Sequence, residues 1–216
     1  MKIKLLSIAF GIALSSTVFT ASAQKAYTEG VITMNQDFGG MNIPVKTYFT
    51  ADSAIASFSQ GPANIKILEN NKQTFFAVLV DVPVAQKKFA GLASPDDIDQ
   101  QKAQFPTYTF TPTTETKQIS GFNCKKVVAK DNKSGQTMDI WVTNDFTVPA
   151  GIVPSFLANA GGFPIQYKST MQGRTSTVTV TSIESQKVPK GTFGISNDYQ
   201  KMSLSDLQSM AKGGGE

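Results

Sequence analysis

The chain has 216 residues, a formal net charge of +4, one cysteine and no histidine. The missing histidine excludes Ser-His-Asp and Cys-His catalytic arrangements and zinc sites that use histidine, because each of them needs an imidazole. The weak positive charge argues against a nucleic-acid partner, which needs clustered lysine and arginine on a strongly basic domain.

Residues 1–23 have the pattern of a secretory signal peptide. Two lysines precede an apolar run over residues 5–19, and Ala21-Ser22-Ala23 supplies a small-x-small cleavage pattern before Gln24. The run is shorter than the roughly 20 residues that span a bilayer, so we expect no transmembrane segment after the signal is removed. Residue 24 is not cysteine, so no lipoprotein anchor is expected. The sequence therefore predicts a periplasmic or secreted protein, cleaved after Ala23.

Cys124 is the only cysteine, so no intrachain disulfide can form and the fold must depend on its hydrophobic core. It lies between Phe122 and Val127 in a predicted strand, where a free cysteine acts as a small apolar side chain. We favour this buried structural role. An intermolecular disulfide or a nucleophile is the alternative.

Short β-type runs separated by turn residues dominate the chain after Gln24. Residues 35–42, which contain Gly39-Gly40, are predicted as a loop. Residues 75–80 are apolar at every position, which is typical of a strand covered on both faces, so a helix is expected over this part of the sheet. The predicted strands are residues 26–34, 45–50, 55–60, 65–69, 74–82, 107–111, 116–120, 123–130, 137–143, 165–171 and 176–184.

Three segments have helical patterns. Ser94-Pro95-Asp96-Asp97 combines a favoured N-cap, a proline at the first position and two carboxylates near the positive end of the helix dipole, and the helix should end near Gln104. These aspartates fit capping better than calcium binding, because the spacing, glycine and glutamate of a calcium loop are missing. Residues 149–162 form either a mobile cover or an ordinary packed helix. Residues 203–211 predict a last helix.

Together these elements predict a mainly β (α+β) fold: a large curved antiparallel sheet, or incomplete β-barrel, covered by two or three short helices. No repeat or change of composition divides the chain, so one domain is expected over residues 24–212, followed by a flexible tail at 213–216. The curved sheet would enclose either an apolar pocket or a filled core. The residues expected to line an apolar ligand pocket are Tyr48, Phe49, Phe75, Tyr108, Phe110, Trp141 and Phe156.

Four short motifs of this chain resemble a known group of proteins. They are Gly121-Phe122-x-Cys124-Lys125, the strand that carries Trp141, Phe193-x-Ile195 and Tyr199-x-x-Met202. The pattern resembles a poorly characterised exported envelope family of Gram-negative bacteria, which is similar to the LolA/LppX superfamily of lipoprotein and lipid carriers. This resemblance implies a half-barrel that holds acyl chains beneath a helical cover.

The function expected from the sequence is that of an exported, non-enzymatic binding protein. It would hold a lipid, an acyl chain or another apolar ligand in the pocket of the curved sheet. The alternative is an interaction or scaffold module with a filled core, which would dock on an envelope protein partner. No enzyme activity, cofactor or metal is expected, because no Gly-x-Ser-x-Gly, phosphate loop or metal spacing occurs. Ser209-x-x-Lys212 resembles a Ser-Lys pair only superficially, at the end of the chain where no pocket is expected.

Overall fold

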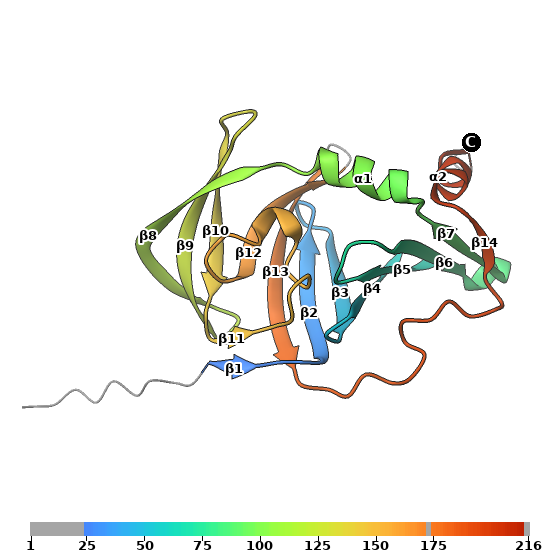
Figure 1. The fold of residues 1–216 in the computed structure, drawn as a ribbon, viewed down its shortest axis with the longest axis horizontal. Helices are drawn as coiled ribbons and strands as arrows, with labels where there is room; N and C mark the ends of the chain where they lie inside the picture. Colours follow the sequence, from blue (N-terminus) through green and yellow to red (C-terminus); the bar gives the residue numbers. More distant parts are fainter. Residues whose placement is uncertain (1–23, 172–173, 214–216) are drawn as a thin grey trace, which may run out of the picture.

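A computed structural model describes residues 24–171 and 174–213. The predicted signal peptide (1–23), two residues of the last hairpin turn (172–173) and the end of the predicted tail (214–216) lie outside the described residues. The fold is mainly β, with one large curved sheet, two α-helices and two short 3₁₀ segments (Figure 1). This architecture confirms the predicted fold class.

Strands dominate the chain, and short helical segments interrupt them at a few places. The strands are β1 (Lys25–Ala26), β2 (Gly30–Asp37), β3 (Asn42–Phe49), β4 (Ser53–Gln60), β5 (Ala63–Asn70), β6 (Phe76–Val82), β7 (Lys87–Leu92), β8 (Tyr108–Ile119), β9 (Phe122–Asp131), β10 (Thr137–Thr143), β11 (Phe146–Thr147), β12 (Phe163–Met171), β13 (Arg174–Glu184) and β14 (Gln200–Ser203). The helices are α1 (Pro95–Gln104) and α2 (Leu204–Gly213), and the 3₁₀ segments are η1 (Pro83–Ala85) and η2 (Ser155–Leu157).

The main sheet has twelve strands in the order β14-β7-β6-β5-β4-β3-β2-β13-β12-β10-β9-β8. All neighbours in it are antiparallel except β14 and β7, and β1 pairs with β11 in a separate two-stranded sheet. The sheet is open because its two edge strands, β8 and β14, do not pair. Helix α1 connects β7, next to one edge, to β8 at the other edge, and so crosses the open side of the curved sheet (Figure 1).

The first predicted strand and the loop after it have different bounds in the structure. Its residues are divided between β1, which pairs with β11, and β2 of the main sheet, and β2 continues to Asp37, well into the predicted loop. The turn is confined to residues 38–41, where the amide of Phe38 donates to the carbonyl of Met41 at 3.0 Å. Strand β2 is central and pairs on both sides, with β3 and β13, so its polar second half stays in the ladder despite a turn-like composition.

The apolar run at residues 75–80 is not covered on both faces as predicted. Ala77 and Leu79 are buried on one face, while Phe76 and Val78 are only partly buried on the other. Phe75 stands before β6 and is 38% exposed. The second face looks toward α1, which covers only part of it. The run therefore marks the edge of a cleft and not a fully buried strand.

Residues 149–162 do not form the predicted helix. They form turns and the single 3₁₀ segment η2, because Pro149 and Pro154 cannot continue an α-helix and Gly151 has a φ of 92°. Leu157 and Ala160 are nonetheless almost completely buried. The segment is thus a packed cover without an α-helix.

Local signals predicted α1 well. The side chain of Ser94 accepts from the amide of Asp97, and the carboxylate of Asp97 accepts from the amide of Ser94, which completes a capping box. The helix ends at Gln104, because Phe105 precedes a proline and adopts an extended conformation. Its middle is held by Ile98, which is buried.

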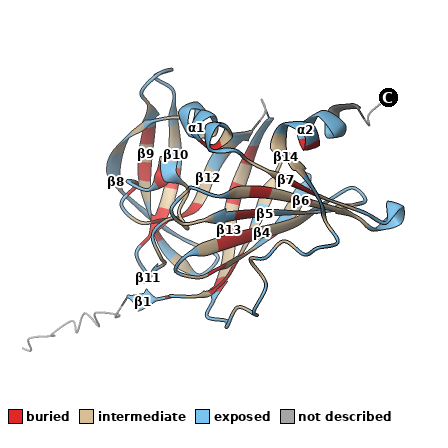
Figure 2. Ribbon diagram, turned by 45° about the vertical axis from the view of Figure 1, so that its right-hand side comes forward, coloured by how far each residue is buried: buried red, intermediate tan, exposed pale blue. Residues whose placement is uncertain are grey.

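Three apolar clusters fill the molecule, and Figure 2 shows their buried positions along the strands. The first cluster lies between the first half of the sheet (β2–β7) and the second half (β8, β9, β10, β12 and β13), and it includes Phe49 and Cys124. The burial of Cys124 confirms its predicted structural role. Burial also raises the pKa of its thiol. The second lies beneath η2, where burial raises the pKa of Tyr167 to about 12. The third cluster lies on the face of β3–β7 that is turned away from α1.

Candidate functional site

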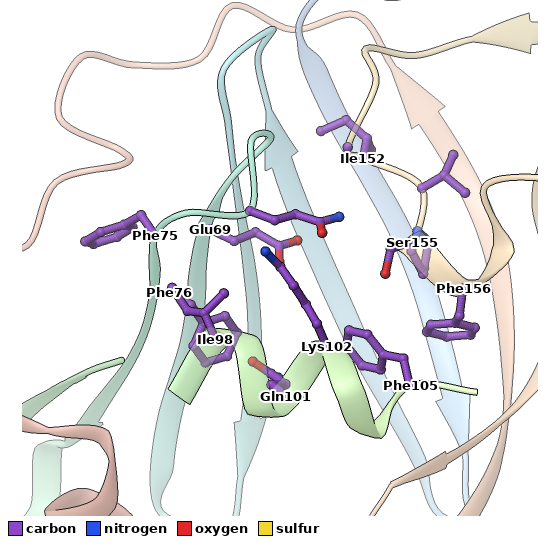
Figure 3. Close-up of a pocket in the computed structure, with 14 residues that line it drawn as sticks. Glu69, Phe75, Phe76, Ile98, Gln101, Lys102, Phe105, Ile152, Ser155 and Phe156 are labelled. Carbon is purple, nitrogen blue, oxygen red and sulfur yellow. The ribbon is translucent and has the colours of Figure 1, made fainter. Parts of the chain in front are cut away.

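A cleft opens where α1 faces the turn between β5 and β6 and the segment that follows β11 (Figure 3). Its volume is about 180 Å³. Three stretches far apart in the sequence supply its walls, so only the folded chain forms it. The lining residues are Glu69, Gln73, Phe75, Phe76, Ile98, Gln101, Lys102, Phe105, Gly151, Ile152, Val153, Pro154, Ser155 and Phe156.

Helix α1 supplies one wall through a set of residues spaced three or four apart. Ile98, Gln101 and Lys102 share one helical face for this reason, and Phe105, the first residue after the helix, continues the wall. The capping box at Ser94 fixes where the helix begins, and therefore which face it turns to the cleft. The hydrogen bond from the backbone amide of Ser94 holds the pKa of Asp97 below its ordinary value, so the cap persists over the neutral range.

Gly151 closes one end of the cleft by packing against the β5–β6 turn. A Cβ atom at this position would lie 2.7 Å from the carbonyl oxygen of Asn71 and 2.8 Å from its Cα, and the φ of 92° is itself favourable only for glycine. Asn71 is held in turn by its side-chain amide, which donates to the carbonyls of Thr50 at 3.1 Å and Ala51 at 2.7 Å. The close backbone contact thus fixes residues 151–156 against the first half of the sheet.

The interior of the cleft is mainly aromatic and continues into the curved sheet. The ring centroids of Phe105 and Phe156 are 5.6 Å apart, and that of Phe156 lies 6.4 Å from Tyr108. Tyr108 in turn lies 6.1 Å from Phe110. Offset aromatic pairs at these distances stabilise one another beyond the area that they bury. The result is one aromatic surface that runs from the mouth of the cleft to the second core cluster.

The polar groups of the cleft are few. Glu69 is exposed as a residue, but its carboxyl group is recessed between the walls, and burial raises its pKa. Lys102 extends from α1 in the direction of Glu69 (Figure 3). Among the described residues it forms an ion pair with Asp99 of its own helix, at 3.9 Å. The side-chain amides of Gln73 and Gln101 make no hydrogen bond in the part of the chain that the structure describes. These amides are therefore available to a ligand.

The seven residues predicted from the sequence to line a pocket are distributed over several environments. Phe75 and Phe156 line the cleft, and Tyr108 and Phe110 pack behind Phe156 in the second core cluster. The other three lie elsewhere: Phe49 is fully buried in the first cluster, Trp141 packs against that cluster, and Tyr48 packs against the third, on the opposite face of the sheet.

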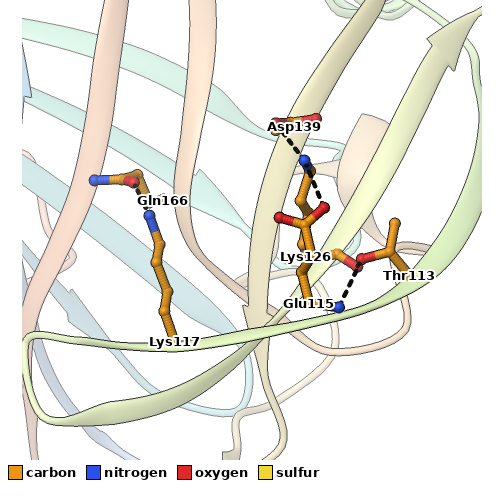
Figure 4. A network of polar contacts seen from close by, with 6 residues as sticks. All are labelled: Thr113, Glu115, Lys117, Lys126, Asp139 and Gln166. Atoms are coloured by element: carbon orange, nitrogen blue, oxygen red, sulfur yellow. Dashed lines mark hydrogen bonds and ion pairs between the residues drawn. The ribbon is translucent and has the colours of Figure 1, made fainter.

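The exposed side of the Trp141 ring is covered by a neighbouring lysine. The amino group of Lys117 lies 4.1 Å from the centroid of its ring and donates to Gln166 at 3.2 Å. Beside it, Lys126 forms ion pairs of 3.0 Å with both Glu115 and Asp139 (Figure 4). The hydrogen bonds to these carboxylates raise the pKa of Lys126. This network links β8, β9, β10 and β12 on the face away from the cleft.

Sequence reasoning missed Glu69, Ile98 and Phe105 as cleft residues. The spacing of Ile98, Gln101 and Lys102 on one helical face was a usable signal, but nothing local indicated what that face would meet. Among the described side chains, no group of three metal-ligating residues comes together. Within the same part of the chain, no helix is long and apolar enough to cross a membrane.

Comparison with known proteins identifies the family. The family model for the N-glycanase peptide, N-terminal domain, matches residues 46–206. Two solved structures of PNGF-II, in space groups C2 and P2₁, match with 20% and 19% identity, cover 84% and 85% of this chain, and have TM-scores of 0.49 and 0.50. The chain covers only 32% and 33% of those longer chains, so it spans about a third of their length. No curated protein matches.

The family match overturns the predicted similarity to LolA/LppX lipid carriers, which was wrong. The motifs that suggested it lie at the β8–β9 corner, on β10 and in the last segment of the chain, where they serve hairpin geometry and packing on the sheet. Such requirements arise in any curved antiparallel sheet, so the motifs do not distinguish one family from another. The chain belongs to the N-glycanase peptide, N-terminal domain family.

Proposed function

We propose that this chain is a non-enzymatic recognition domain and that its cleft binds an apolar side chain of an extended polypeptide. One observation carries the proposal: Phe75 and Phe105 remain 38% and 37% exposed although both line a concave site. Exposed large apolar side chains that gather in a concavity are typical of binding sites.

The size of the cleft supports a small apolar group as its occupant. At about 180 Å³ it is smaller than the roughly 300–1,000 Å³ of a pocket that holds a whole drug-sized ligand. One aromatic or aliphatic side chain would fit inside, with the rest of the ligand along the rim. The amides of Gln73 and Gln101 can donate to and accept from peptide groups there.

The residues of the cleft also support a non-enzymatic role. Glu69 is the single carboxylate among the lining residues, and the chain has no histidine to serve as its partner in acid–base catalysis at neutral pH. The family is named after an N-glycanase, which links it to proteins that carry N-linked glycans. In our proposal this unit helps to hold the polypeptide part of such a protein.

Binding measured by titration calorimetry tests the proposal. The probes are a short glycopeptide with a phenylalanine beside its glycosylated asparagine, the same glycopeptide with serine in place of the phenylalanine, and the free glycan. The phenylalanine probe should bind and the other two should bind at least several-fold more weakly. Equal binding of the two glycopeptides, or preferential binding of the free glycan, would refute recognition of the side chain.

Variants locate the binding site. Phe105→Ala and Phe75→Ala should each weaken binding of the phenylalanine probe by roughly tenfold, because each removes part of an apolar wall. Met41→Ala is the matched control, since Met41 is 50% exposed in the β2–β3 turn and does not line the cleft. Thermal unfolding of each variant verifies that the fold is retained.

Export is a separate part of the proposal. Residues 1–23 have the signal-peptide pattern, and we propose that the protein works outside the cytoplasm after their removal. Expression of the full chain in a bacterial host, followed by fractionation and N-terminal sequencing, tests this. A mature chain that begins at Gln24 in the periplasm or medium is expected, and an uncleaved cytoplasmic chain would contradict it.

A further inference from the structure

A second cavity lies on the opposite face of the sheet from the cleft. Residues 185–199, which connect β13 to β14, cross the outer face of β3–β7 without forming a strand or helix (Figure 1). Between this crossing segment and the sheet is a cavity of about 290 Å³. Its lining residues are Tyr48, Ile55, Ser57, Lys66, Leu79, Gly191, Thr192, Gly194, Ser196 and Tyr199.

The crossing segment is attached around the cavity. Phe193, Ile195 and Tyr199 pack against the third core cluster. At the end of the segment, Lys88 of β7 donates to Asp198 at 2.7 Å, and its amino group lies 5.7 Å from the centroid of the Tyr199 ring. Both apolar and ionic contacts therefore set the position of this wall of the cavity, which is open to solvent where Lys66 is exposed.

Four side chains that line this cavity have polar groups that can bind a ligand. Tyr48, Ser57, Lys66 and Tyr199 make no side-chain hydrogen bond or ion pair with any residue that the structure describes. Thr192, in contrast, uses its hydroxyl to donate to the carbonyl of Pro189 at 2.8 Å. The spare groups are three hydroxyls and one ammonium, which together can bind an anion that also carries hydroxyl groups.

The strand register makes this place positively charged. Ser57 pairs directly with Lys46 on one side and with Lys66 on the other, so the two lysines flank it on the same face of the sheet. Asp81 and Asp198 are both paired with Lys88, at 3.8 and 2.7 Å. Lys46 and Lys66 thus have no carboxylate partner in the described structure, and a bound anion would supply one.

We propose that this cavity is a second binding site, for a small sugar acid. Lys66 would hold its carboxylate, Ser57 and Tyr48 would bind its hydroxyl groups, and the ring of Tyr199 would cover one face of the sugar. Tyrosine suits this role because it offers an apolar face and a polar edge together. The site is independent of the cleft, since the two lie on opposite faces of the sheet and share no residue.

Titration of the full chain, with the isotope-labelled protein observed by NMR, tests the proposal with three probes: sodium glucuronate, glucose and sodium acetate. Glucuronate should bind saturably and shift resonances around Lys66 and Tyr199, and added salt should weaken it. Glucose lacks the anion and acetate lacks the hydroxyls, so each should bind several-fold more weakly. Failure of glucuronate to saturate, or equal binding of acetate, would overturn the assignment.

Two variants and a control complete the test. Lys66→Met should weaken glucuronate binding by roughly tenfold or more, because a charged hydrogen bond is lost, and Tyr199→Phe should weaken it less. Lys130→Met, which removes an exposed lysine from β9, should leave it unchanged. Unaltered affinity in a folded Lys66→Met protein would refute the site. Phe105→Ala should not affect glucuronate, so failure of the cleft proposal would be distinguishable.

Discussion

The two halves of the sheet are covered in different ways. The second half is formed by β8, β9, β10, β12 and β13, and residues 149–162 cover it. This cover contributes Leu157 and Ala160, which are 0% and 2% exposed and belong to the core. Over the outer face of the first half, formed by β2–β7, residues 185–199 contribute side chains that are only partly buried. The second cavity lies under residues 185–199, whereas the cleft lies on the other face of the sheet, between α1 and residues 151–156.

The sequences of the two covers explain this difference. Residues 152–157 read Ile-Val-Pro-Ser-Phe-Leu, and most of these side chains can enter a core. Residues 185–199 are largely polar, with isolated apolar residues such as Phe193 and Ile195. Isolated apolar residues pack a segment against the sheet only at their own positions and leave gaps between the segment and the sheet. A dense apolar run packs continuously and leaves fewer gaps. Cavities are therefore expected under the polar cover.

The largest effect should come from truncating each cover at an apolar residue. Leu157→Ala should lower the free energy of unfolding by about 2–5 kcal/mol, because it leaves a cavity in a closed core. Ile195→Ala should cost about 1 kcal/mol or less, since Ile195 is already partly exposed. Urea denaturation measures both. A similar loss of the free energy of unfolding for the two substitutions would show that the two covers pack equally well against the sheet.

The contact between the halves can be tested at Gly151. Gly151→Ala should cost about 2–4 kcal/mol, because the new Cβ would meet the backbone of Asn71 and the positive φ would also be strained. Gly161→Ala is the matched control: its φ is +84°, but no atom lies within 4 Å of the new Cβ, so only the backbone strain of about 1 kcal/mol remains. If the two variants lose equal stability in urea denaturation, the close packing at Asn71 contributes nothing.

The pH dependence of stability should reveal the recessed carboxyl group of the cleft. Burial raises the pKa of Glu69 above its ordinary value of 4.5, so the folded state favours the protonated form. The stabilisation is fully present below the ordinary pKa and is lost as pH rises through the higher pKa of the folded state. Glu69→Gln should remove this loss of stability between the two pKa values. An unchanged pH profile in the variant would show that Glu69 is fully solvated.

The smallest effect is expected where the crossing segment is tied to β7. The hydrogen bond from Lys88 holds the pKa of Asp198 below its ordinary value of 3.8. Its contribution to stability is present above pH 3.8 and is lost as pH falls through the lower pKa of the folded state. Lys88→Met should return the pKa of Asp198 toward 3.8, as followed by carboxyl NMR titration. An unaltered titration would mean that the pair does not persist in solution.

The sequence predicted those parts of the fold that depend on neighbouring residues. The start of α1 at Ser94 and the hairpin strands follow from capping and turn residues within a few positions. The length of β2 was not predicted, because its polar end is held in the sheet by β3 and β13. Residues 149–162 were predicted as either a mobile cover or a packed helix; the apolar spacing suggested the helix, but the prolines and the contact at Gly151 prevent one.

The candidate cleft was predicted only in part. Phe75 and Phe156 were chosen as pocket residues because they are aromatic, and both line the cleft. Glu69, Ile98 and Phe105 join them from β5 and α1, and that meeting depends on how α1 crosses the open side of the sheet. Residue type indicated a supply of apolar surface, while the long-range topology decided where it gathered.

Methyl NMR spectroscopy with the phenylalanine-bearing glycopeptide tests the central claim most directly, because it shows which face of the sheet takes the ligand. Ile98 and Ile152 line the cleft, whereas Ile55 and Leu79 line the cavity on the opposite face. The account predicts that the methyl resonances of Ile98 and Ile152 shift on titration and that those of Ile55 and Leu79 do not. Shifts confined to Ile55 and Leu79, or no shift at any of the four, would contradict it.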